Sequence, residues 1–193
     1  MQSIRRLYVA KKGIFADEAK RLLTDLQENL LIKGLTDIHI FHRYDVSVST
    51  MRLLKRLKNM IFSEPPVDAV YDTLPTREGD TVLAVEYLPG QYDQRADSAV
   101  QCLQMLTMKN DSLVRTAQVI VLSGDLSGTD ITAIKNYCIN PVEAREASLE
   151  PATSLELAWE KPADVPTVEG FISMDDAAFD RPLVANGPGY ELR

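Results

Sequence analysis

The sequence runs twice through the same series of a strand, a helix, a strand and a helix, and this order limits the folds open to it. Strand segments alternate apolar and polar residues, whereas helix segments repeat apolar residues at i, i+3, i+4 and i+7. The predicted strands cover 4–11, 37–44, 67–71, 81–87 and 114–123, and the predicted helices cover 16–31, 49–61, 93–109 and 129–137. Each element has one apolar face, so a chain of this order has to pack helices against a sheet.

The two series also have matching residues at the junction between their first strand and first helix. GIFADEA (residues 13–19) overlays GQYDQRA (residues 90–96), with a glycine, an aromatic residue and an alanine at matching places. Shared letters together with a shared element order indicate an internal repeat. We therefore expect two related halves with pseudo-twofold symmetry.

The fold class expected from this pattern is α+β. Two pseudo-repeated β-α-β-α units would form a mostly antiparallel sheet with helices on one face. A parallel, doubly wound sheet is the alternative, and the short connection after Tyr71 disfavours it. Gly34 is expected to end the first helix in a left-handed conformation, and Ser49 or Thr50 to cap the second.

The residue composition and the periodicity of the sequence change after Asn140. Glutamates, arginines and alanines come first, and prolines then interrupt a stretch with weak periodicity. Such a composition is typical of a linker. We therefore expect a folded domain over 1–142 and an irregular linker or extension over 143–193.

Composition excludes several classes of protein. Of the 193 residues, 45% are hydrophobic and 25% charged, which is typical of a globular chain with a real core. No apolar run reaches the ~20 residues of a membrane helix, and no secretion signal is recognisable, so we expect a cytoplasmic protein without a membrane partner. The net charge of -7 argues against a nucleic-acid partner.

Motifs for catalysis or metal binding are not recognisable in the sequence. The expected sites therefore include no catalytic residue and no metal ligand, and no phosphate-binding glycine loop is found. His39 and His42 fall on opposite faces of a predicted strand, so they cannot ligate one ion together without a bulge in that strand. Cys102 and Cys138 have no metal or disulfide spacing, and we expect both to be buried free thiols.

The most unusual segment is a dense polar stretch at the junction between the strand 81–87 and the helix that follows. Its polar side chains can all form directional hydrogen bonds, and Arg95 can pair in a forked geometry with a carboxylate. Two interpretations stay open: a capping network in which Asp93 caps the helix, and a docking or ligand site. The candidate interface residues are Gln91, Asp93, Gln94, Arg95 and Asp97.

Four strings in this sequence resemble the single-chain phosphoribosylformylglycinamidine synthases. They are LPGQYDQRADSAVQC (residues 88–102), GLTDIHIFHRYDV (34–46), FSEPPVD (62–68) and INPVEARE (139–146). The resemblance extends over residues 4 to 175, with the strings in the family's order. It implies a part of a ligase of purine biosynthesis, a glutamine amidotransferase that amidates formylglycinamide ribonucleotide with glutamine and ATP.

The resemblance covers only the family's N-terminal domain and the start of its linker. It implies a domain like a dimer of the small subunit found in the multi-subunit enzyme. The domain would act in assembly and ammonia channelling, with the synthetase and glutaminase domains as partners in cis or in trans. ATP and magnesium belong to the complete enzyme, so no cofactor is expected in this chain, and the chain is expected to be inactive alone.

Two alternatives to this assignment are retained. Residues 179–193 depart from the family pattern, which indicates a truncated product or a fragment. A stand-alone small α+β binding or regulatory module is the other hypothesis for function. An independent enzyme is disfavoured, because nucleophile, metal and phosphate motifs are not recognisable.

Overall fold

A computed structural model describes residues 3–48 and 51–156 of the chain. The chain divides into a compact unit that ends at residue 157 and a second unit over 158–193. The second unit lies outside the described residues, as do the expected caps Ser49 and Thr50 and the divergent segment 179–193.

Six antiparallel strands form one sheet in the described part of the chain, in the order β3-β1-β2-β5-β4-β6. The strands are β1 (Ser3–Lys11), β2 (Leu35–Val48), β3 (Asp68–Tyr71), β4 (Thr81–Tyr87), β5 (Val114–Gly124) and β6 (Ala144–Glu146). Because all of these pairs are antiparallel, the parallel doubly wound alternative is wrong.

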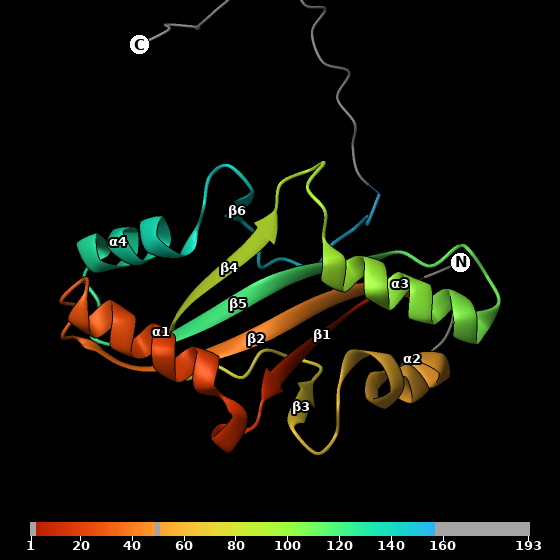
Figure 1. Cartoon of the computed structure of the whole chain (residues 1–193), viewed down its shortest axis with the longest axis horizontal. Helices are drawn as coiled ribbons and strands as arrows, with labels where there is room; N and C mark the ends of the chain where they lie inside the picture. The colour runs from red at the N-terminus through yellow and green to blue at the C-terminus, as the bar shows by residue number, and fades with distance from the viewer. Residues whose placement is uncertain (1–2, 49–50, 157–193) are drawn as a thin grey trace, which may run out of the picture. The chain divides into compact units, whose positions relative to one another are not determined.

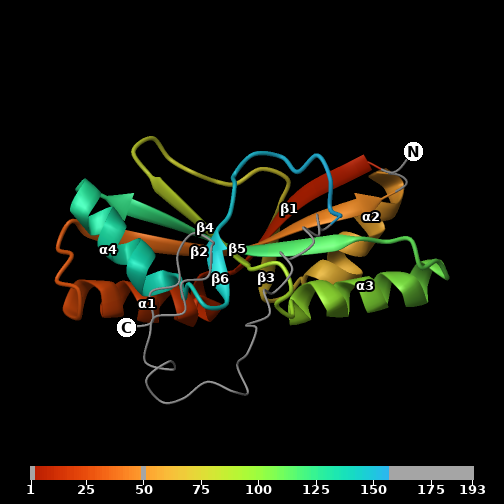
Figure 2. The ribbon, with the colours of Figure 1, turned by 90° about the horizontal axis from the view of Figure 1, so that it is seen from above.

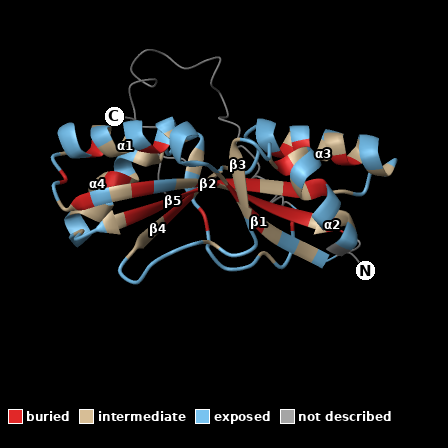
Figure 3. Ribbon diagram, turned by 90° about the horizontal axis from the view of Figure 1, so that it is seen from below, coloured by how far each residue is buried: buried red, intermediate tan, exposed pale blue. Residues whose placement is uncertain are grey.

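The four α-helices of the described residues lie on one face of this sheet, as the views from the front and from below show (Figure 1, Figure 3). They are α1 (Asp17–Glu28), α2 (Met51–Leu57), α3 (Gln94–Thr107) and α4 (Gly128–Cys138). A 3₁₀ turn, Gly13–Phe15, precedes α1, and a π-helical turn, Lys58–Phe62, continues α2. The predicted α+β class, with an antiparallel sheet and helices on one face, is confirmed.

The strand order is the same in both halves when it is read from the centre outward. From β2 the order is β2-β1-β3, and from β5 it is β5-β4-β6. The first half places its strands as β1-α1-β2-α2-β3 along the chain, and the second half repeats this as β4-α3-β5-α4-β6. This arrangement is consistent with the expected pseudo-twofold repeat, with the β2–β5 pair at its centre.

Both apolar clusters beneath the helices combine residues of the two halves. One cluster joins α2 to α3, for example through Leu54 and Leu103, and the other joins α1 to α4 through Leu26 and Ile134. Each helix therefore packs next to a helix of the other half (Figure 1). Burial of this kind makes the two halves depend on each other for a complete core.

The opposite face of the sheet is crossed by residues 147–156, as the view from above shows (Figure 2). We call residues 147–156 the strap. Three arginines from neighbouring strands donate to its backbone: Arg6 to Leu149 O (2.6 Å), Arg43 to Ser148 O (2.6 Å) and Arg115 to Leu155 O (2.8 Å). These bonds fix an irregular segment in place, because they satisfy carbonyl groups that no strand pairs.

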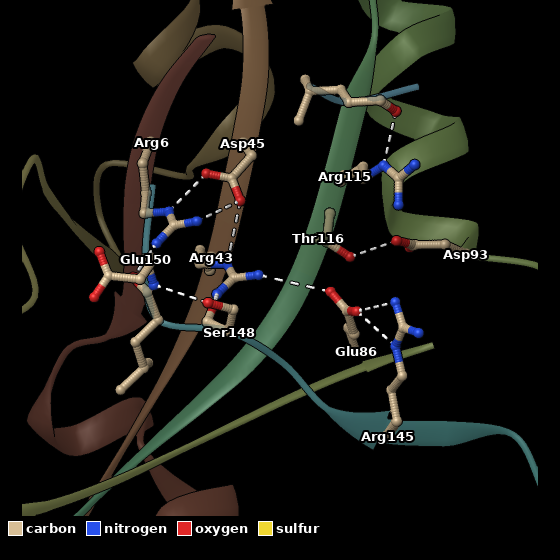
Figure 4. Close-up of polar contacts among 12 residues, drawn as sticks. Arg6, Arg43, Asp45, Glu86, Asp93, Arg115, Thr116, Arg145, Ser148 and Glu150 are labelled. Atoms are coloured by element: carbon tan, nitrogen blue, oxygen red, sulfur yellow. Dashed lines mark hydrogen bonds and ion pairs between the residues drawn. The ribbon is translucent and has the colours of Figure 1, made fainter. Parts of the chain in front are cut away.

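The arginines of this face are themselves compensated by carboxylates (Figure 4). Asp45 is 2% exposed, and its carboxylate accepts hydrogen bonds from Nε and Nη2 of Arg6 at 2.7 and 3.0 Å. Arg43 lies 3.3 Å from the same carboxylate and 3.8 Å from that of Glu86. A buried charge is tolerated in a core only when it is paired in this way.

Several elements differ from their expected limits. The strand β6 and the strap lie within residues that the sequence pattern assigns to the linker. The strand was not recognised because three residues carry too little periodicity. The strand β2 continues to Val48, past its expected end at Tyr44. Its residues Arg43 and Asp45 are buried, contrary to what their charge suggests.

Gly34 does not have the role expected of it. The helix α1 ends at Glu28, and the left-handed residue that follows is Leu31 rather than Gly34. A Cβ on Gly34 would lie 2.0 Å from Asp125 O, and a Cβ on Gly124 would lie 2.1 Å from Gly34 O. The backbones of residues 34 and 124–125 thus approach closely at this end of the β2–β5 pair, and glycine is required for their close approach.

Candidate functional site

A hollow of about 720 Å³ lies on the helix-bearing face of the sheet, between the start of α3 and the end of α4. We call it the central groove. The central strands supply His42, Tyr44, Thr116 and Gln118, and α3 with the residue before it supplies Asp93, Gln94 and Arg95. Asn140 and Glu143 contribute from the connection between α4 and β6. A second hollow of about 540 Å³ shares Gln118 and Cys138 with it.

The central groove lies where the sheet becomes polar beneath the helices. Along β2, the residues on the helix side are apolar at Ile38, Ile40 and Val46, with His42 between them. His42 is the register partner of Gln118 at the centre of the sheet. The polar floor therefore lies on the β2–β5 pair about which the two halves are related.

Asp93 connects the groove to the fold. One carboxylate oxygen accepts from the Ala96 backbone NH at 2.9 Å and so caps α3, and the other accepts from the Thr116 hydroxyl at 2.7 Å (Figure 4). The capping role predicted for Asp93 is confirmed. The bond to Thr116 adds a link from α3 to β5 that sequence periodicity does not reveal.

Arg95 contacts the groove floor. Its guanidinium donates to the Tyr44 hydroxyl at 3.1 Å and lies 3.4 Å from His42 Nε2. No carboxylate of the described residues forms an ion pair with it. Burial, with the positive charge of Arg95 second, lowers the pKa of His42 from 6.5 to about 4. His42 is therefore a neutral imidazole at pH 7, able to accept a hydrogen bond from Arg95.

The predicted interface residues separate into two groups. Asp93, Gln94 and Arg95 line the central groove, whereas Gln91 and Asp97 do not. Asp97 instead accepts from the Tyr92 hydroxyl at 2.9 Å and from Gln101 at 2.7 Å. Gln91 is exposed, in the turn before α3. The dense polar segment thus contains a capping and surface network as well as residues that face a hollow.

The two halves place opposite charges at matching positions. In the overlay of 13–19 on 90–96, Glu18 matches Arg95. Arg95 lies against His42, and Glu18 accepts from Gln118 at 2.8 Å. Because His42 and Gln118 are register partners, these two contacts lie side by side across the centre of the sheet. The repeat has kept the geometry and reversed the sign of the charge.

Both cysteines line the central groove and both are free. They are half-buried, which is less than the full burial expected for them. Burial raises the pKa of Cys138 to about 11, so this thiol is protonated at pH 7. A protonated thiol is a poor nucleophile and a poor metal ligand.

Sequence reasoning missed most of the groove floor and its far wall. His42 is in phase with Ile38 and Ile40, so its strand position alone could have placed it on the helix side. Glu143 gave no such signal, because only the pairing of β6 with β4 brings it near α3. In residues 3–48 and 51–156, no group of three His, Cys, Asp or Glu side chains is placed to hold a metal ion.

Comparisons of the chain with protein-family models, with curated proteins and with solved structures gave no match. The described residues also contain no helix that is both long enough and apolar enough to cross a bilayer. Fold and site together define a two-layer α+β domain with an internal pseudo-twofold repeat and a polar central groove.

Proposed function

We propose that this chain is the N-terminal part of a phosphoribosylformylglycinamidine synthase and acts in the cytoplasm. Its role would be to hold the synthetase and glutaminase domains together and to help form the path for ammonia. It would supply no catalytic residue, and ATP and magnesium would bind elsewhere in the complete enzyme. The observation that carries the proposal is the strand order repeated outward from β2–β5, since a fused dimer of a small subunit would have this order.

The positions of the family-like strings also support the proposal. Residues 88–102 and 139–146 contribute to two walls of the central groove, and His42 and Tyr44 from residues 34–46 contribute to its floor. Three strings that are far apart in the sequence thus contribute to one surface. A surface used for docking has this property, because it depends on residues that only the fold brings together.

Ammonia transfer supplies the physical reason for such a domain. Ammonia in free solution is protonated and lost, so two active sites that share it have to be held in a rigid, closed arrangement. Gln91, Gln94 and Arg95 are exposed at the start of α3 and are available to a partner surface. They are our candidates for the docking contact.

The test is to add this chain to a synthase of the family from which the N-terminal domain has been removed. We expect it to raise glutamine-dependent turnover and to have a much smaller effect on turnover with added ammonium chloride. Arg95→Ala should reduce the glutamine-dependent gain at least fivefold. Arg56→Ala is the matched control, because Arg56 is an exposed arginine on α2 and does not line the groove.

Two results would contradict the proposal. Glutamine-dependent turnover that stays unchanged on addition of the chain would remove the assembly role. Equal rescue by the Arg95→Ala variant and by the parent chain would remove the docking role of Arg95 and leave assembly in place.

A second candidate function is a stand-alone binding module, which the volume of the central groove favours. Its 720 Å³ is within the range of about 300–1,000 Å³ typical of small-molecule sites. Thermal unfolding of the full chain with a panel of nucleotides, purine intermediates and amino acids tests this function. A saturable rise in Tm with any of these compounds supports it, and no shift with any of them contradicts it.

A further inference from the structure

We propose that the central groove binds a free α-amino acid as a zwitterion, with the ligand carboxylate on Arg95 and the ligand ammonium on Glu143. This inference rests on the second proposed function and adds the ligand's chemical class and the groups that hold it. It does not depend on the chain's docking to synthase domains.

The carboxylate end is assigned to Arg95 because that side chain has unused donors beside the groove. A guanidinium has five N–H donors, and Tyr44 and His42 account for two of them. The contacts to Tyr44 and His42 also restrict the orientation of the side chain before a ligand arrives. An oriented guanidinium without a carboxylate partner is suited to bind a carboxylate through paired hydrogen bonds.

The ammonium end is assigned to Glu143, which lines the same hollow from the connection between α4 and β6. Its backbone is fixed at both groups: its NH donates to Asn140 O at 3.1 Å, and its carbonyl accepts from Leu88 NH at 2.9 Å. Its carboxylate makes no hydrogen bond or ion pair with any of the described residues. A free carboxylate on a fixed backbone can accept a ligand ammonium without first breaking a protein contact.

The charges around the groove favour a zwitterion over a phosphate. Among the described residues, Arg95 is the one cationic side chain that lines it, beside the carboxylates of Glu86, Asp93 and Glu143. His42 adds no positive charge at pH 7, because its pKa is about 4. Asp93 is engaged by Thr116, and Glu86 is paired with Arg145 at 2.8 Å, so Glu143 is the carboxylate left to match a ligand cation. A doubly charged phosphate would meet one cation and a nearby free carboxylate.

The experiment is isothermal titration calorimetry of the full chain with each of the twenty proteinogenic L-amino acids, and with AMP and inorganic phosphate as separate arms. We expect saturable binding of at least one amino acid and none of the phosphate compounds. For the tightest ligand, Arg95→Gln and Glu143→Gln should each weaken binding at least tenfold. Arg56→Gln is the control and should bind like the parent, and thermal unfolding checks that every variant is folded.

Ligand derivatives show which end of the ligand each residue holds. The α-amide lacks the carboxylate, so amidation should weaken binding to the parent chain but have little further effect in Arg95→Gln. The N-acetyl derivative lacks the ammonium, so acetylation should have little further effect in Glu143→Gln. Additive losses in both cases would overturn the assignment of the two ends.

The remaining outcomes separate the inference from the function on which it rests. Binding of AMP or phosphate that depends on Arg95, with no binding of amino acids, overturns the ligand class and leaves the second proposed function standing. Amino-acid binding that both groove variants retain overturns the site. No binding in any arm contradicts the inference, whereas the second proposed function fails only if its wider panel of nucleotides and purine intermediates gives no shift in Tm either.

Discussion

Asp93 illustrates how one side chain can serve both local structure and tertiary structure. The sequence position identifies it as a helix cap, and the cap is formed to the Ala96 NH. The bond to Thr116 links the same carboxylate to the middle of the sheet. This carboxylate therefore links the start of α3, which lines the groove, to β5.

Asp93→Ala is expected to lower the free energy of unfolding by about 2 kcal/mol, since it removes a helix cap and a side-chain hydrogen bond together. Denaturant unfolding measures this loss. Asp97→Ala is the matched control, with an expected loss of about 0.5 kcal/mol, because its partners Tyr92 and Gln101 are at the surface. Equal losses in the two variants would contradict the combined contribution of the cap and the contact with Thr116.

The lowered pKa of His42 predicts that the stability of the fold depends on pH. This pKa falls from 6.5 to about 4 in the folded chain, first because of burial and then because of Arg95. The unfolded chain therefore takes up the proton first as the pH falls. The contribution of His42 to stability, on the order of 3 kcal/mol, is fully present above about pH 6.5 and is lost as the pH falls toward 4.

Two measurements check this prediction. An NMR titration should place the midpoint of His42 near pH 4, and Arg95→Gln should raise that midpoint by removing a nearby positive charge. The stability of His42→Gln should depend less on pH between 4 and 6.5 than that of the parent chain. A midpoint for His42 at its ordinary value would contradict the burial on which the groove floor depends.

The strap is an element without regular secondary structure that arginines hold in place. Arg6, Arg43 and Arg115 belong to three adjacent strands, and each donates to a different carbonyl of the strap. The strap carbonyls thus accept hydrogen bonds from side chains, whereas the carbonyls of a strand accept them from the backbone of a neighbouring strand. These bonds hold the last described residues of the compact unit in place as far as Leu155.

Arg115→Ala is expected to increase local opening of the strap. A hydrogen bond from a charged group is worth about 1.5–3 kcal/mol, which corresponds to roughly a tenfold or greater rise in the open population. Hydrogen exchange of peptides from residues 147–156 measures this population. Arg145→Ala is the control, since Arg145 pairs with Glu86 and makes no bond to the strap. Unchanged exchange in Arg115→Ala would show that the arginine does not hold the strap.

The two halves of the molecule form their cores together. Each cluster beneath the helices contains residues of both halves, and the β2–β5 pair joins the halves through the longest ladder of the sheet. A half on its own would expose one side of each cluster and a long unpaired strand edge. The repeat in the sequence therefore describes the geometry of the domain and does not mark two independent domains.

Separate expression of residues 1–76 and 77–193 tests this dependence. We expect neither half alone to show cooperative thermal unfolding by circular dichroism, because both cores are incomplete. Mixed or co-expressed, the halves should form an equimolar complex that unfolds cooperatively. The full chain is the control, and cooperative unfolding of either half alone would contradict the shared cores.

Most elements were predictable because their signals are local. The limits of β4 agree with the sequence pattern, and α3 begins directly after its predicted cap. The exceptions have physical causes. The end of β2 was not recognised because it contains charged residues, which sequence patterns assign to the surface. Asp45 can be buried there because Arg6 of another strand compensates its charge. The shortness of β6 hides it as well, because three residues cannot show an alternation.

The sequence by itself determined the order of the elements as far as α4, their amphipathic faces, the cap at Asp93 and the presence of a repeat, since each depends on residues close together in the chain. The strand order, the pairing of helices across halves, the strap and the central groove depended on contacts between distant residues. Arg95 meets His42 only after β2 and β5 have paired and Asp93 has docked α3 on the sheet. One-dimensional periodicity carries no information on such pairings, so the groove could be recognised only in the folded chain.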